Sequence, residues 1–438
     1  MWIEVILTTN KRLEMKVLVV GDGGREHALV WKLAQSPKVS RLWCAPGNAG
    51  IGSERLSDGK LVENLEIAVT DIDGLCTFAT RHSVDLVVVG PEEPLSMGIC
   101  DRFLENDIPT FGPCKRETLF ESSKSFSDAF MAKYDIPRPK SMSFGHDCQG
   151  VKPAVDFATF LRKCAVKASG LASGKGVFLC QNPAEAEEAI KKLLTEKALG
   201  SAGEEIVIQE LLEGQECSVH AICGGNSYKI FPLSQDLKEA YPEGPLTGGM
   251  RAMCPVSFSS INAQMIEDQI LRPWLEGCKK EDLNFSGLLY PGLMLTKTGP
   301  KVLEFNARFG DPETQVYMSR LESDLFDLLS VATETSGLKK FGEIQWSPKF
   351  AVCVILASAG YPGKYKKGKV ITGLGDAKKV SGAKVFHSGT CLINGKVYTN
   401  GGRVLGVTAI KDSLKEAMET AYGVAEIIQF EGKWFRRD

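Results

Sequence analysis

Residues 167–177, with the sequence KASGLASGKGV, combine glycines, serines and lysines in one short loop. Backbone N–H groups in a glycine-rich loop can close around phosphate oxygens, and a lysine adds positive charge. A Walker A loop has four residues between its first glycine and its Gly-Lys pair, and Ser or Thr follows the lysine. Here three residues separate Gly170 from Gly174, and Gly176 follows Lys175. The stretch therefore predicts a phosphate-binding loop of another kind.

A second group of polar residues follows a predicted strand, in the sequence VLEFNARFGDPE at 302–313. Glu304 and Asn306 alternate with apolar neighbours, so their side chains share one face of the strand. A carboxylate beside an amide oxygen suits Mg²⁺ that also binds nucleotide phosphates. Arg308 lies two residues further on, so it would share this face and could hold a substrate carboxylate through two hydrogen bonds. Alternatively, Glu304 and Arg308 form a surface ion pair.

A glycine-rich turn, GDGGRE at 21–26, lies between a predicted strand and a predicted helix. This order is typical of a dinucleotide site, but Glu26 stands in the place of the third glycine. Residues 41–46 contain no acid that could bind the ribose of such a nucleotide. The turn therefore disfavours NAD and leaves two possibilities. One is a simple phosphate on a helix N-terminus, and the other is a tight turn without a ligand.

The acidic stretch QELLEGQE, at 209–216, is a weaker candidate. A strand that runs into a linker can offer backbone groups to the edge of an adenine. Glu216 could then accept hydrogen bonds from ribose hydroxyl groups. An acidic turn of this composition is also typical of a solvated surface, so these residues alone leave both interpretations open.

The composition is that of an ordinary globular protein, with 43% hydrophobic and 24% charged residues. A chain of 438 residues exceeds what one core supports, so we expect about two to four domains. The 52 basic and 54 acidic residues nearly balance, which argues against nucleic acid or a membrane surface as a partner. There is no basic, signal-like N-terminus and no apolar run as long as a membrane span, so we expect a cytoplasmic protein.

Cysteine and histidine are the residues that would build disulfides or a zinc site. The 13 cysteines include no C-x-x-C pair, and none of the 5 histidines has H-x-x-x-H spacing. We therefore expect reduced thiols and no zinc site. Any metal should be a hard cation held by carboxylates and phosphates.

The elements that must position these residues begin with an N-terminal alternation of strands and helices. Apolar runs at 16–21, 41–45, 65–69 and 85–91 predict buried strands, and 25–36 predicts a helix. Such alternation is typical of an open parallel sheet with crossover helices. The loops GDGG, APGNAG and GPEEP lie at the carboxyl ends of predicted strands. They would share the edge of the sheet where open α/β folds bind ligands.

The rest of the chain predicts further domains. The prolines of YDIPRPKS, at 134–141, indicate a domain boundary. After about residue 346 the chain becomes rich in strands and turns. The other predicted elements are a strand containing Lys167, a helix over 184–199, a strand over 205–214, a strand pair formed by LLYPGLML and 300–310, and a helix near 413–428.

A lysine on a strand, a glycine-rich loop, an acidic hinge and a Glu-x-Asn strand occur here in the order typical of ATP-grasp enzymes. The whole set resembles one ATP-grasp family, the glycinamide ribonucleotide synthetases, and the similarity extends over nearly the whole chain from Met15. It rests on GDGGREHAL, APGNAG, VGPEEPL, ESSKSF, KASGLASGKGV, QELLEGQE, TGGM, EFNARFGDPETQ, GYPGKY and NGGRVLGVTA.

The resemblance implies an α/β fold with an N-terminal open parallel sheet, an ATP-grasp fold and a small C-terminal domain rich in β-structure. The loop at 167–177 would then be a mobile lid over the triphosphate. The implied domains are an N-terminal extension (1–14), a phosphoribosylamine-binding domain (15–118), a central ATP-grasp domain (119–136 and 212–345), a lid domain (137–211) and a C-terminal domain (346–438).

The implied reaction joins glycine to 5-phosphoribosylamine through a glycyl phosphate. It converts ATP to ADP and phosphate, gives glycinamide ribonucleotide and belongs to purine biosynthesis. ATP is the co-substrate, and Mg²⁺ or Mn²⁺ is the implied metal. The implied partners are these small molecules alone, and we expect a monomer.

The resemblance also implies roles for individual residues. Arg308 and Lys175 would act in catalysis, Arg308 by holding the glycine carboxylate, and Glu304 with Asn306 would hold the metal. The residues implied for ATP are Lys124, Lys167, Gly174, Lys175, Gly176, Gln209, Glu210, Leu211, Leu212, Glu216 and Lys238. Those implied for phosphoribosylamine are Gly23, Gly24, Asn48, Glu92, Thr247, Gly248 and Gly249.

One region, QDLKEAYPEGPLTGGMRAM, departs from the family pattern. The family usually has His-Lys-Arg here, then Gly-Pro-Asn-Thr-Gly-Gly-Met-Gly after a connection about two residues longer. The departing residues are Leu237 and Glu239 on either side of the lysine, Leu246 in place of asparagine, and Arg251 in place of the last glycine. The chain also reads RRD at 436–438, where the family's last strand usually continues.

These departures carry an expectation of their own. Leu246 cannot donate or accept a hydrogen bond, so we expect one polar contact near ATP and the amine to be missing. Arg251 could compensate by reaching a phosphate. In the alternative, Arg251 points to water and contributes nothing to the site.

Other functions compete with this interpretation. Another ATP-grasp carboxylate–amine ligase would share the central motifs but not the terminal ones. A dinucleotide-dependent oxidoreductase would use the turn at 21–26, which lacks the required glycine and acid. A binding protein without activity is favoured only by the departures at 237–251, and a turnover assay separates it from the ligase.

Overall fold

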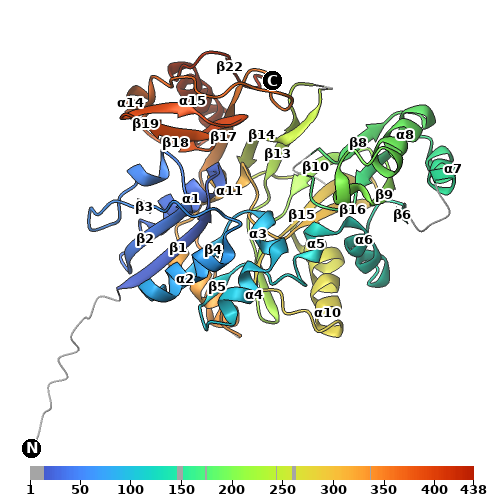
Figure 1. Cartoon of the computed structure of the whole chain (residues 1–438), viewed down its shortest axis with the longest axis horizontal. Helices are drawn as coiled ribbons and strands as arrows, with labels where there is room; N and C mark the ends of the chain where they lie inside the picture. The colour runs from blue at the N-terminus through green and yellow to red at the C-terminus, as the bar shows by residue number, and fades with distance from the viewer. Residues whose placement is uncertain (1–13, 146–150, 173–174, 243, 259–262, 336) are drawn as a thin grey trace, which may run out of the picture.

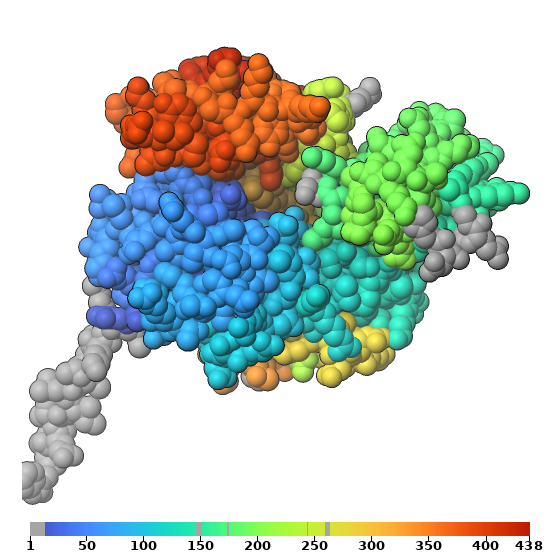
Figure 2. Space-filling model, in the orientation of Figure 1, coloured from blue at the N-terminus to red at the C-terminus, as the bar shows by residue number. Residues whose placement is uncertain are grey.

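The computed structural model describes residues 14–145, 151–172, 175–242, 244–258, 263–335 and 337–438. In Figure 1 the N-terminal part is blue and lies below the orange and red C-terminal part, and a green part stands to one side. Figure 2 shows a recess where these parts meet. Within the described ranges, no helix is both long and apolar enough to cross a membrane.

The N-terminal part is a parallel sheet in the order β3-β2-β1-β4-β5. Val17 and Val19 of the first strand enter one core, whereas Leu18 and Val20 enter another, because helices cover both faces. The predicted open parallel sheet is confirmed. Its elements are β1 (Met15–Gly21), α1 (Gly24–Leu33), β2 (Val39–Pro46), β3 (Glu63–Asn64), α2 (Ile72–His82), β4 (Leu86–Val89), α3 (Glu92–Met97), α4 (Ile99–Leu104) and β5 (Thr110–Phe111).

The predicted strand at 65–69 is wrong. The edge strand is β3 and stops at Asn64. Leu65, Ile67 and Val69 are half-buried and pack on the core beside α2 without joining the ladder. The alternation of apolar residues here reflects a loop that packs against the core, and a period of two does not by itself require a pairing partner.

The green part is an antiparallel sheet in the order β6-β9-β7-β8, with two helices packed on one face. The predicted helix at 184–199 is shorter than expected. Residues 191–195 form a π-helical turn, and Lys197 has a φ of 51°, which ends the helical path. The elements are β6 (Ser141–Gly145), α7 (Val151–Leu161), β7 (Cys164–Ala168), β8 (Val177–Cys180), α8 (Pro183–Ile190) and β9 (Glu205–Glu210).

The central part contains a second antiparallel sheet, in which the predicted strand pair is confirmed as β15 and β16. A core rich in aromatic side chains joins this sheet to the helices around it, and Trp274 and Phe120 lie at its centre. The elements are α5 (Leu119–Ser122), α6 (Lys124–Lys133), β10 (Gln215–Ser218), β11 (Ala221–Gly224), β12 (Ser227–Ile230), α9 (Ala263–Ile266), α10 (Arg272–Lys280), β15 (Gly287–Thr296), β16 (Gly299–Asn306), α12 (Leu325–Ala332) and α13 (Gly337–Lys340).

The C-terminal part is built on a third antiparallel sheet, in the order β13-β14-β17-β21-β18, with β22 paired to β17. The hairpin β13–β14 belongs to an earlier stretch of sequence, so this sheet crosses the boundary expected at residue 346. Ser413 caps the predicted helix near 413–428 by accepting a hydrogen bond from Glu416 N. The elements are β13 (Gln235–Glu239), β14 (Leu246–Cys254), α11 (Glu313–Arg320), β17 (Phe350–Ser358), α14 (Leu374–Ala377), β18 (Ala383–His387), β19 (Thr390–Ile393), β20 (Lys396–Thr399), β21 (Arg403–Lys411), α15 (Leu414–Ile427) and β22 (Lys433–Trp434).

Candidate active site

Glu304 lies on β16 among three lysines from different parts of the chain. Lys167 comes from β7, Lys238 from β13 and Lys124 from the first turn of α6. We call these four residues the lysine cluster. Lys238 Nζ is 3.6 Å from Glu304 Oε1. Burial would raise the pKa of Glu304, but the three ammonium groups lower it to about 2. Its carboxylate is therefore ionised at neutral pH.

Lys167 is the most enclosed of these lysines, with 6% of its surface exposed. Its ammonium group donates a hydrogen bond to the carbonyl oxygen of Leu303 at 3.0 Å and forms no ion pair with a described carboxylate. Burial lowers the pKa of Lys167 to about 8, although the charge of Glu304 opposes this shift. A buried cation without a carboxylate in contact favours the approach of an anion.

Arg308 lies just beyond β16 and beside Asn306. Its guanidinium donates to Asn306 Oδ1 at 3.3 Å and approaches the carboxylates of Glu121 at 3.0 Å and Glu92 at 3.4 Å. Burial would lower the pKa of Arg308, but Glu121 and Glu92 raise it above its usual value. The alternative ion pair between Glu304 and Arg308 is wrong, since Arg308 pairs with these other acids. Asn306 and Arg308 therefore lie together, as the spacing predicts.

Glu304 and Asn306 fit a hard divalent cation that also binds phosphate oxygens. The Glu304 side chain is 27% exposed and ionised, and Asn306 offers an amide oxygen on the same strand face. One or two carboxylates plus substrate phosphates are the usual ligands of Mg²⁺. Among the residues that the structure places, no group of three or more His, Cys, Asp and Glu side chains could hold a metal. The donors present therefore suit a cation that binds together with a nucleotide.

The glycine-rich loop connects β7, which carries Lys167, to β8. Gly176 accepts a hydrogen bond from Ala168 N at 2.8 Å, and Lys124 N donates to Ser169 O at 3.0 Å. The second bond ties the start of α6 to the loop. Lys175 is exposed. Gly174 lies outside the described residues.

The residues implied for adenine and ribose line the passage from β9 to β10. Gln209 is buried, and Leu211 and Leu212 are half-buried. Glu210 accepts a hydrogen bond from Lys140 N at 2.8 Å. Glu216 is half-buried, whereas residues 213–215 are exposed, as a solvated turn would be. Burial raises the pKa of Glu216, and the charge of Lys238 in the lysine cluster opposes this rise.

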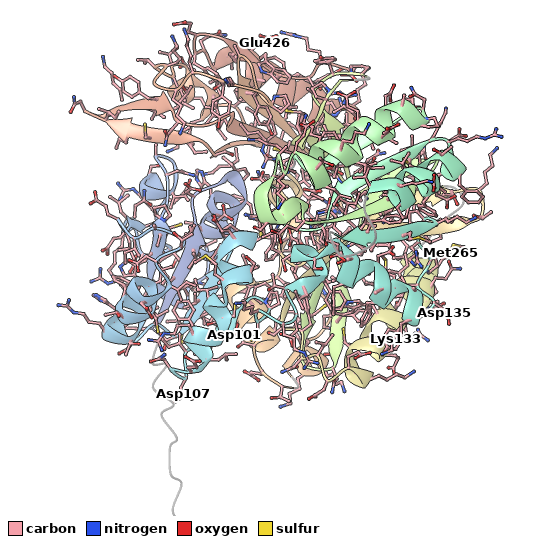
Figure 3. The ribbon with its side chains drawn as sticks, turned by 45° about the vertical axis from the view of Figure 1, so that its right-hand side comes forward. Asp101, Asp107, Lys133, Asp135, Met265 and Glu426 are labelled. Atoms are coloured by element: carbon pink, nitrogen blue, oxygen red, sulfur yellow. The ribbon has the colours of Figure 1, made fainter. Side chains whose placement is uncertain are left out.

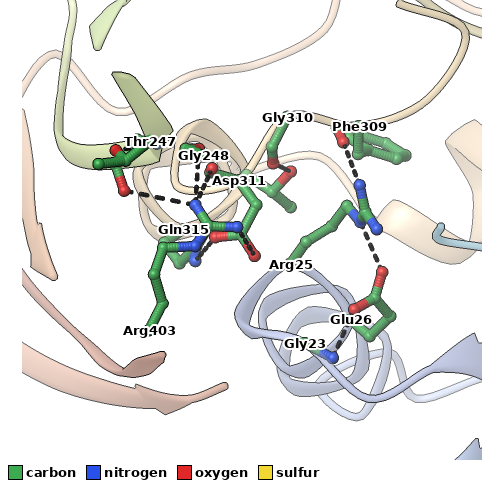
Figure 4. Close-up of polar contacts among 12 residues, drawn as sticks. Gly23, Arg25, Glu26, Thr247, Gly248, Phe309, Gly310, Asp311, Gln315 and Arg403 are labelled. Carbon is green, nitrogen blue, oxygen red and sulfur yellow. Dashed lines mark hydrogen bonds and ion pairs between the residues drawn. The ribbon is translucent and has the colours of Figure 1, made fainter. Parts of the chain in front are cut away.

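The turn at Gly23 and Gly24 begins α1 and is filled by the side chain of Glu26. The Glu26 carboxylate accepts a hydrogen bond from Gly23 N at 2.7 Å (Figure 4). A Cβ at Gly24 would lie 2.5 Å from Ser388 Oγ and 2.6 Å from Gln315 Nε2, so only glycine allows this close approach. The turn therefore joins the N-terminal and C-terminal parts, and one of its N–H groups is already used.

The side chain of Asn48 is fully occupied within the protein. Its Nδ2 donates to the carbonyl oxygens of Asp22 at 2.7 Å and His387 at 2.8 Å, and its Oδ1 accepts from Gly50 N and Ile51 N. An amide has two donors and one carbonyl oxygen with two acceptor sites, so none remains. Asn48 therefore orders the loop, and only its backbone is left for contact with a substrate.

Arg403 of β21 joins strand β14 to the segment between β16 and α11. Its guanidinium donates to the carbonyl oxygens of Gly248 at 2.7 Å and Asp311 at 2.6 Å, and approaches the Asp311 carboxylate at 3.4 Å. Figure 4 shows this guanidinium between the two segments, with Arg25 and Glu26 close by. Asp311 and Arg403 therefore hold the β14 strand beside the turn that begins α1.

Thr247 holds the same strand from its other side. Its Oγ1 donates to Lys238 O at 2.7 Å and accepts from Gly249 N at 3.0 Å. Gly249 has a φ of 111°, which favours glycine. Gly248 is exposed, and its N–H donates to Tyr361 Oη at 3.2 Å. Residues 247–249 thus lie beside Lys238.

The expectation for Arg251 is wrong in both of its forms. Arg251 is buried, with 8% of its surface exposed, so it does not point to water. It also does not point toward the lysine cluster, because it donates to Tyr422 Oη at 2.9 Å and to the carbonyl oxygen of Asp438. In the β13–β14 ladder Arg251 pairs with Leu237, and Glu239 pairs with Leu246. The departing residues therefore contact one another and the C-terminal part.

Several polar and charged residues of the site were given no role from sequence, although each lies inside a family-like sequence. They are Arg25 and Glu26 in GDGGREHAL, Glu121 in ESSKSF, Asp311 and Gln315 in EFNARFGDPETQ, and Arg403 in NGGRVLGVTA. The contacts of Arg25 with Glu26 and of Gln315 with Asp311 are local. The pairs Glu121–Arg308 and Asp311–Arg403 join distant parts of the chain, so only the fold shows them.

Three models of one protein family match most of this chain. Residues 15–121 match the family model of the phosphoribosylglycinamide synthetase N domain. Residues 122–314 match that of the ATP-grasp (A) domain, and residues 351–438 match that of the C domain.

Proteins of known name are similar over nearly the full length. The phosphoribosylamine–glycine ligase of Caldanaerobacter subterraneus is 43% identical over 433 residues, which cover 97% of this chain and 99% of that protein. The trifunctional purine biosynthetic protein adenosine-3 of Gallus gallus is 45% identical over 97% of this chain, which spans 42% of that longer protein.

Solved structures share the arrangement of the elements. The crystal structure of phosphoribosylamine–glycine ligase from Thermotoga maritima has a TM-score of 0.79 at 30% identity, and the match covers 97% of this chain and 100% of that one. The biotin carboxylase domain of Hydrogenobacter thermophilus 2-oxoglutarate carboxylase has a TM-score of 0.71 at 12% identity, over 96% of this chain and 92% of that one. This second likeness concerns the fold alone.

Proposed function

Because the chain belongs to the phosphoribosylglycinamide synthetase family, we propose that it joins glycine to 5-phosphoribosylamine while ATP becomes ADP and phosphate. The product is glycinamide ribonucleotide, an intermediate of purine biosynthesis. The observation that carries the proposal is the lysine cluster, in which Lys124, Lys167 and Lys238 surround the ionised Glu304. Ammonium groups gathered from separate elements around one carboxylate suit a nucleotide triphosphate and its metal.

The chemistry begins with activation of the glycine carboxylate, which is a poor electrophile. Attack of a carboxylate oxygen on the γ-phosphorus of ATP breaks the bond to the bridging oxygen and yields glycyl phosphate and ADP. Lys124, Lys167 and Lys238 stabilise the negative charge of the phosphoryl group during transfer. The glycine-rich loop, with Lys175 exposed on it, closes over the phosphates and excludes water from the acyl phosphate.

Glu304 and Asn306 would hold the divalent cation. When bound, Mg²⁺ or Mn²⁺ neutralises phosphate charge and orients the triphosphate. Gln209, Glu210, Leu211 and Leu212 surround the adenine in this proposal, and Glu216 accepts hydrogen bonds from the ribose.

Arg308 orients the glycine carboxylate. Its guanidinium is held on one side by Glu121 and Glu92, so its remaining donors have a defined direction. The amine of 5-phosphoribosylamine then attacks the acyl carbon, phosphate leaves and the amine loses a proton. The loops at Gly23–Gly24, Asn48 and Glu92, together with 247–249, receive this substrate in the proposal.

The division into domains stays part of the proposal. Residues 15–118 would carry phosphoribosylamine, 119–136 and 212–345 the nucleotide, 137–211 the lid, and 346–438 the C-terminal domain. The separate green sheet supports a lid that moves as a unit (Figure 1). We also retain a monomeric state and a cytoplasmic location as proposals, and sedimentation of the purified chain tests the first.

The test of the function is phosphate release with glycine and freshly generated 5-phosphoribosylamine. We expect release that requires both substrates together, or only a slow partial reaction when the amine is omitted. Product mass identifies glycinamide ribonucleotide. Equal turnover with an unrelated amine acceptor would contradict the assignment and favour another ATP-grasp ligase.

A further inference from the structure

The hairpin β13–β14 carries Lys238 at a break in its own pairing. Leu237 pairs with Arg251, but Glu239 pairs with Leu246, so the register shifts between these two pairs. Lys238 lies at this shift and has no residue opposite it in the register of the ladder. An interrupted ladder constrains a strand less than a regular one does. The position of the Lys238 ammonium group therefore depends on contacts outside the ladder.

Such contacts come from the segment that follows β22. Arg436 Nη1 donates to Glu239 O at 2.9 Å and approaches Glu239 Oε2 at 3.3 Å. The same guanidinium contacts both carboxylate oxygens of Asp438, with Nη2 at 2.6 Å and Nε at 2.7 Å. Its side chain is only 8% exposed. A guanidinium held at this many points is rigid, and bidentate pairing adds directional specificity.

Arg251 completes the arrangement from the second strand. Its guanidinium contacts the carbonyl oxygen of Asp438 and donates to Tyr422 Oη at 2.9 Å. We call Glu239, Arg251, Arg436 and Asp438 the tail clasp. Both hairpin members, Glu239 and Arg251, are positions where this sequence departs from the family pattern. The departing residues of the hairpin therefore meet residues of the RRD segment that have the opposite charge.

We infer that the tail clasp positions Lys238 for the nucleotide, and that Arg436 is a positioning residue of the active site. Arg436 fixes the main chain of Glu239, which directly follows Lys238. Thr247 fixes the carbonyl of Lys238 itself at 2.7 Å. The Lys238 ammonium is thereby kept 3.6 Å from Glu304. This inference rests on the proposed function, in which Lys238 contacts ATP.

The neighbouring Arg437 provides a matched control. Its side chain is 69% exposed and pairs with Glu426 on the outer surface of the C-terminal part (Figure 3). It has the same chemistry as Arg436 and lies next to it, but its contacts in the described structure are with Glu426 and the ring of Phe435 and not with the hairpin. Arg437→Gln thus removes an arginine without removing the tail clasp.

The experiment measures the affinity of the full-length protein for MgADP by calorimetry. We expect Arg436→Gln to weaken binding about tenfold, because a small displacement of a binding group has a large effect. Arg437→Gln should stay within twofold of the unmodified protein. In a protein that already carries Lys238→Met, Arg436→Gln should weaken MgADP binding by less than a further twofold. A purely structural role would instead give the same loss in both backgrounds, and that result would overturn the inference.

A second measurement does not depend on the nucleotide. Amide hydrogen exchange of the peptide that covers 237–239 should be about tenfold faster in Arg436→Gln, because the segment opens locally. Arg436→Lys keeps the positive charge but can make fewer contacts, so exchange of this peptide should be intermediate. This variant replaces Arg436→Gln in the experiment if the glutamine variant does not fold. Unchanged exchange in both variants would overturn the inference. A protein that shows these effects but no ligase activity would instead refute the proposed function alone.

Discussion

The Gly23–Gly24 turn and the lysine cluster belong to one candidate site, but their charged groups are satisfied in opposite ways. At the turn, Glu26 accepts from Gly23 N, and Arg403 contacts both the carbonyl and the carboxylate of Asp311. In the lysine cluster, Lys167 contacts only a carbonyl oxygen, and Lys238 approaches Glu304 no closer than 3.6 Å. The first region is complete without a ligand, whereas the second holds Lys167, a buried cation that contacts no described carboxylate and that an anion would satisfy.

The difference separates a region that holds parts of the chain together from one that binds charge. Buried ion pairs are strongly destabilising to break, because the remaining charge loses its partner. A buried lysine without a carboxylate in contact destabilises the ligand-free fold, and it obtains an oppositely charged partner when phosphate binds. Substitutions at the turn should therefore lower stability first, and substitutions in the lysine cluster should lower nucleotide binding and turnover first.

The largest effect should come from Glu304→Gln. Loss of one preorganised charge at the metal position should lower turnover by about 10²–10³-fold and weaken the dependence on Mg²⁺. A Mg²⁺ titration of steady-state phosphate release measures both effects. Glu213→Gln is the matched control, because Glu213 is an exposed acid near the same strands. Activity of Glu304→Gln equal to that of the control would remove Glu304 from the metal site.

Arg403→Gln tests the other region. Removal of this guanidinium leaves Asp311 without its buried partner, so the free energy of unfolding should fall by about 2–4 kcal/mol. MgADP affinity should change less than about threefold. Chemical denaturation and calorimetry provide the two values. Arg41→Gln, whose pair with Glu63 is exposed, should cost about 1 kcal/mol or less. A large loss of MgADP affinity in Arg403→Gln with little loss of stability would reverse the comparison.

Lys167→Met should show that the lysine cluster reduces stability in the absence of a ligand. The pKa of Lys167 is lowered to about 8 in the fold, so between about pH 8 and 10.5 the unfolded chain binds more protons than the native one. Stability of the unmodified protein should therefore rise with pH in this window relative to Lys167→Met, by about 1–3 kcal/mol. Denaturation at pH 7 and pH 10 measures the difference. A difference that does not vary with pH would show that Lys167 has no lowered pKa.

The smallest effect should follow deletion of residues 1–14. Residues 1–13 lie outside the described part, and the first strand begins at Met15. Because neither region of the comparison includes this extension, we expect a melting temperature within about 2 °C of the full chain and unchanged turnover. A drop of more than a few degrees would show that the extension packs on the fold.

Much of the arrangement follows from local patterns in the sequence. The buried runs at 16–21 and 85–91 became β1 and β4, and the alternation of Glu304 and Asn306 placed both on β16. Local patterns did not predict the structure of 65–69, where alternating apolar residues pack on the core but do not pair with a neighbouring strand. They also could not show that β13–β14 joins the C-terminal sheet, because strand partners are chosen by topology.

The sequence by itself therefore determined the fold class, the glycine-rich loop and the residue types of the lysine cluster. These depend on hydrophobic period, turn chemistry and spacing within a few residues. Only the tertiary structure decided that Arg308 pairs with Glu121 and that Arg251 turns to Asp438 and not toward the nucleotide. Each of these partners lies far away in the chain, and a buried charge takes whichever opposite charge the packing of the domains brings within reach.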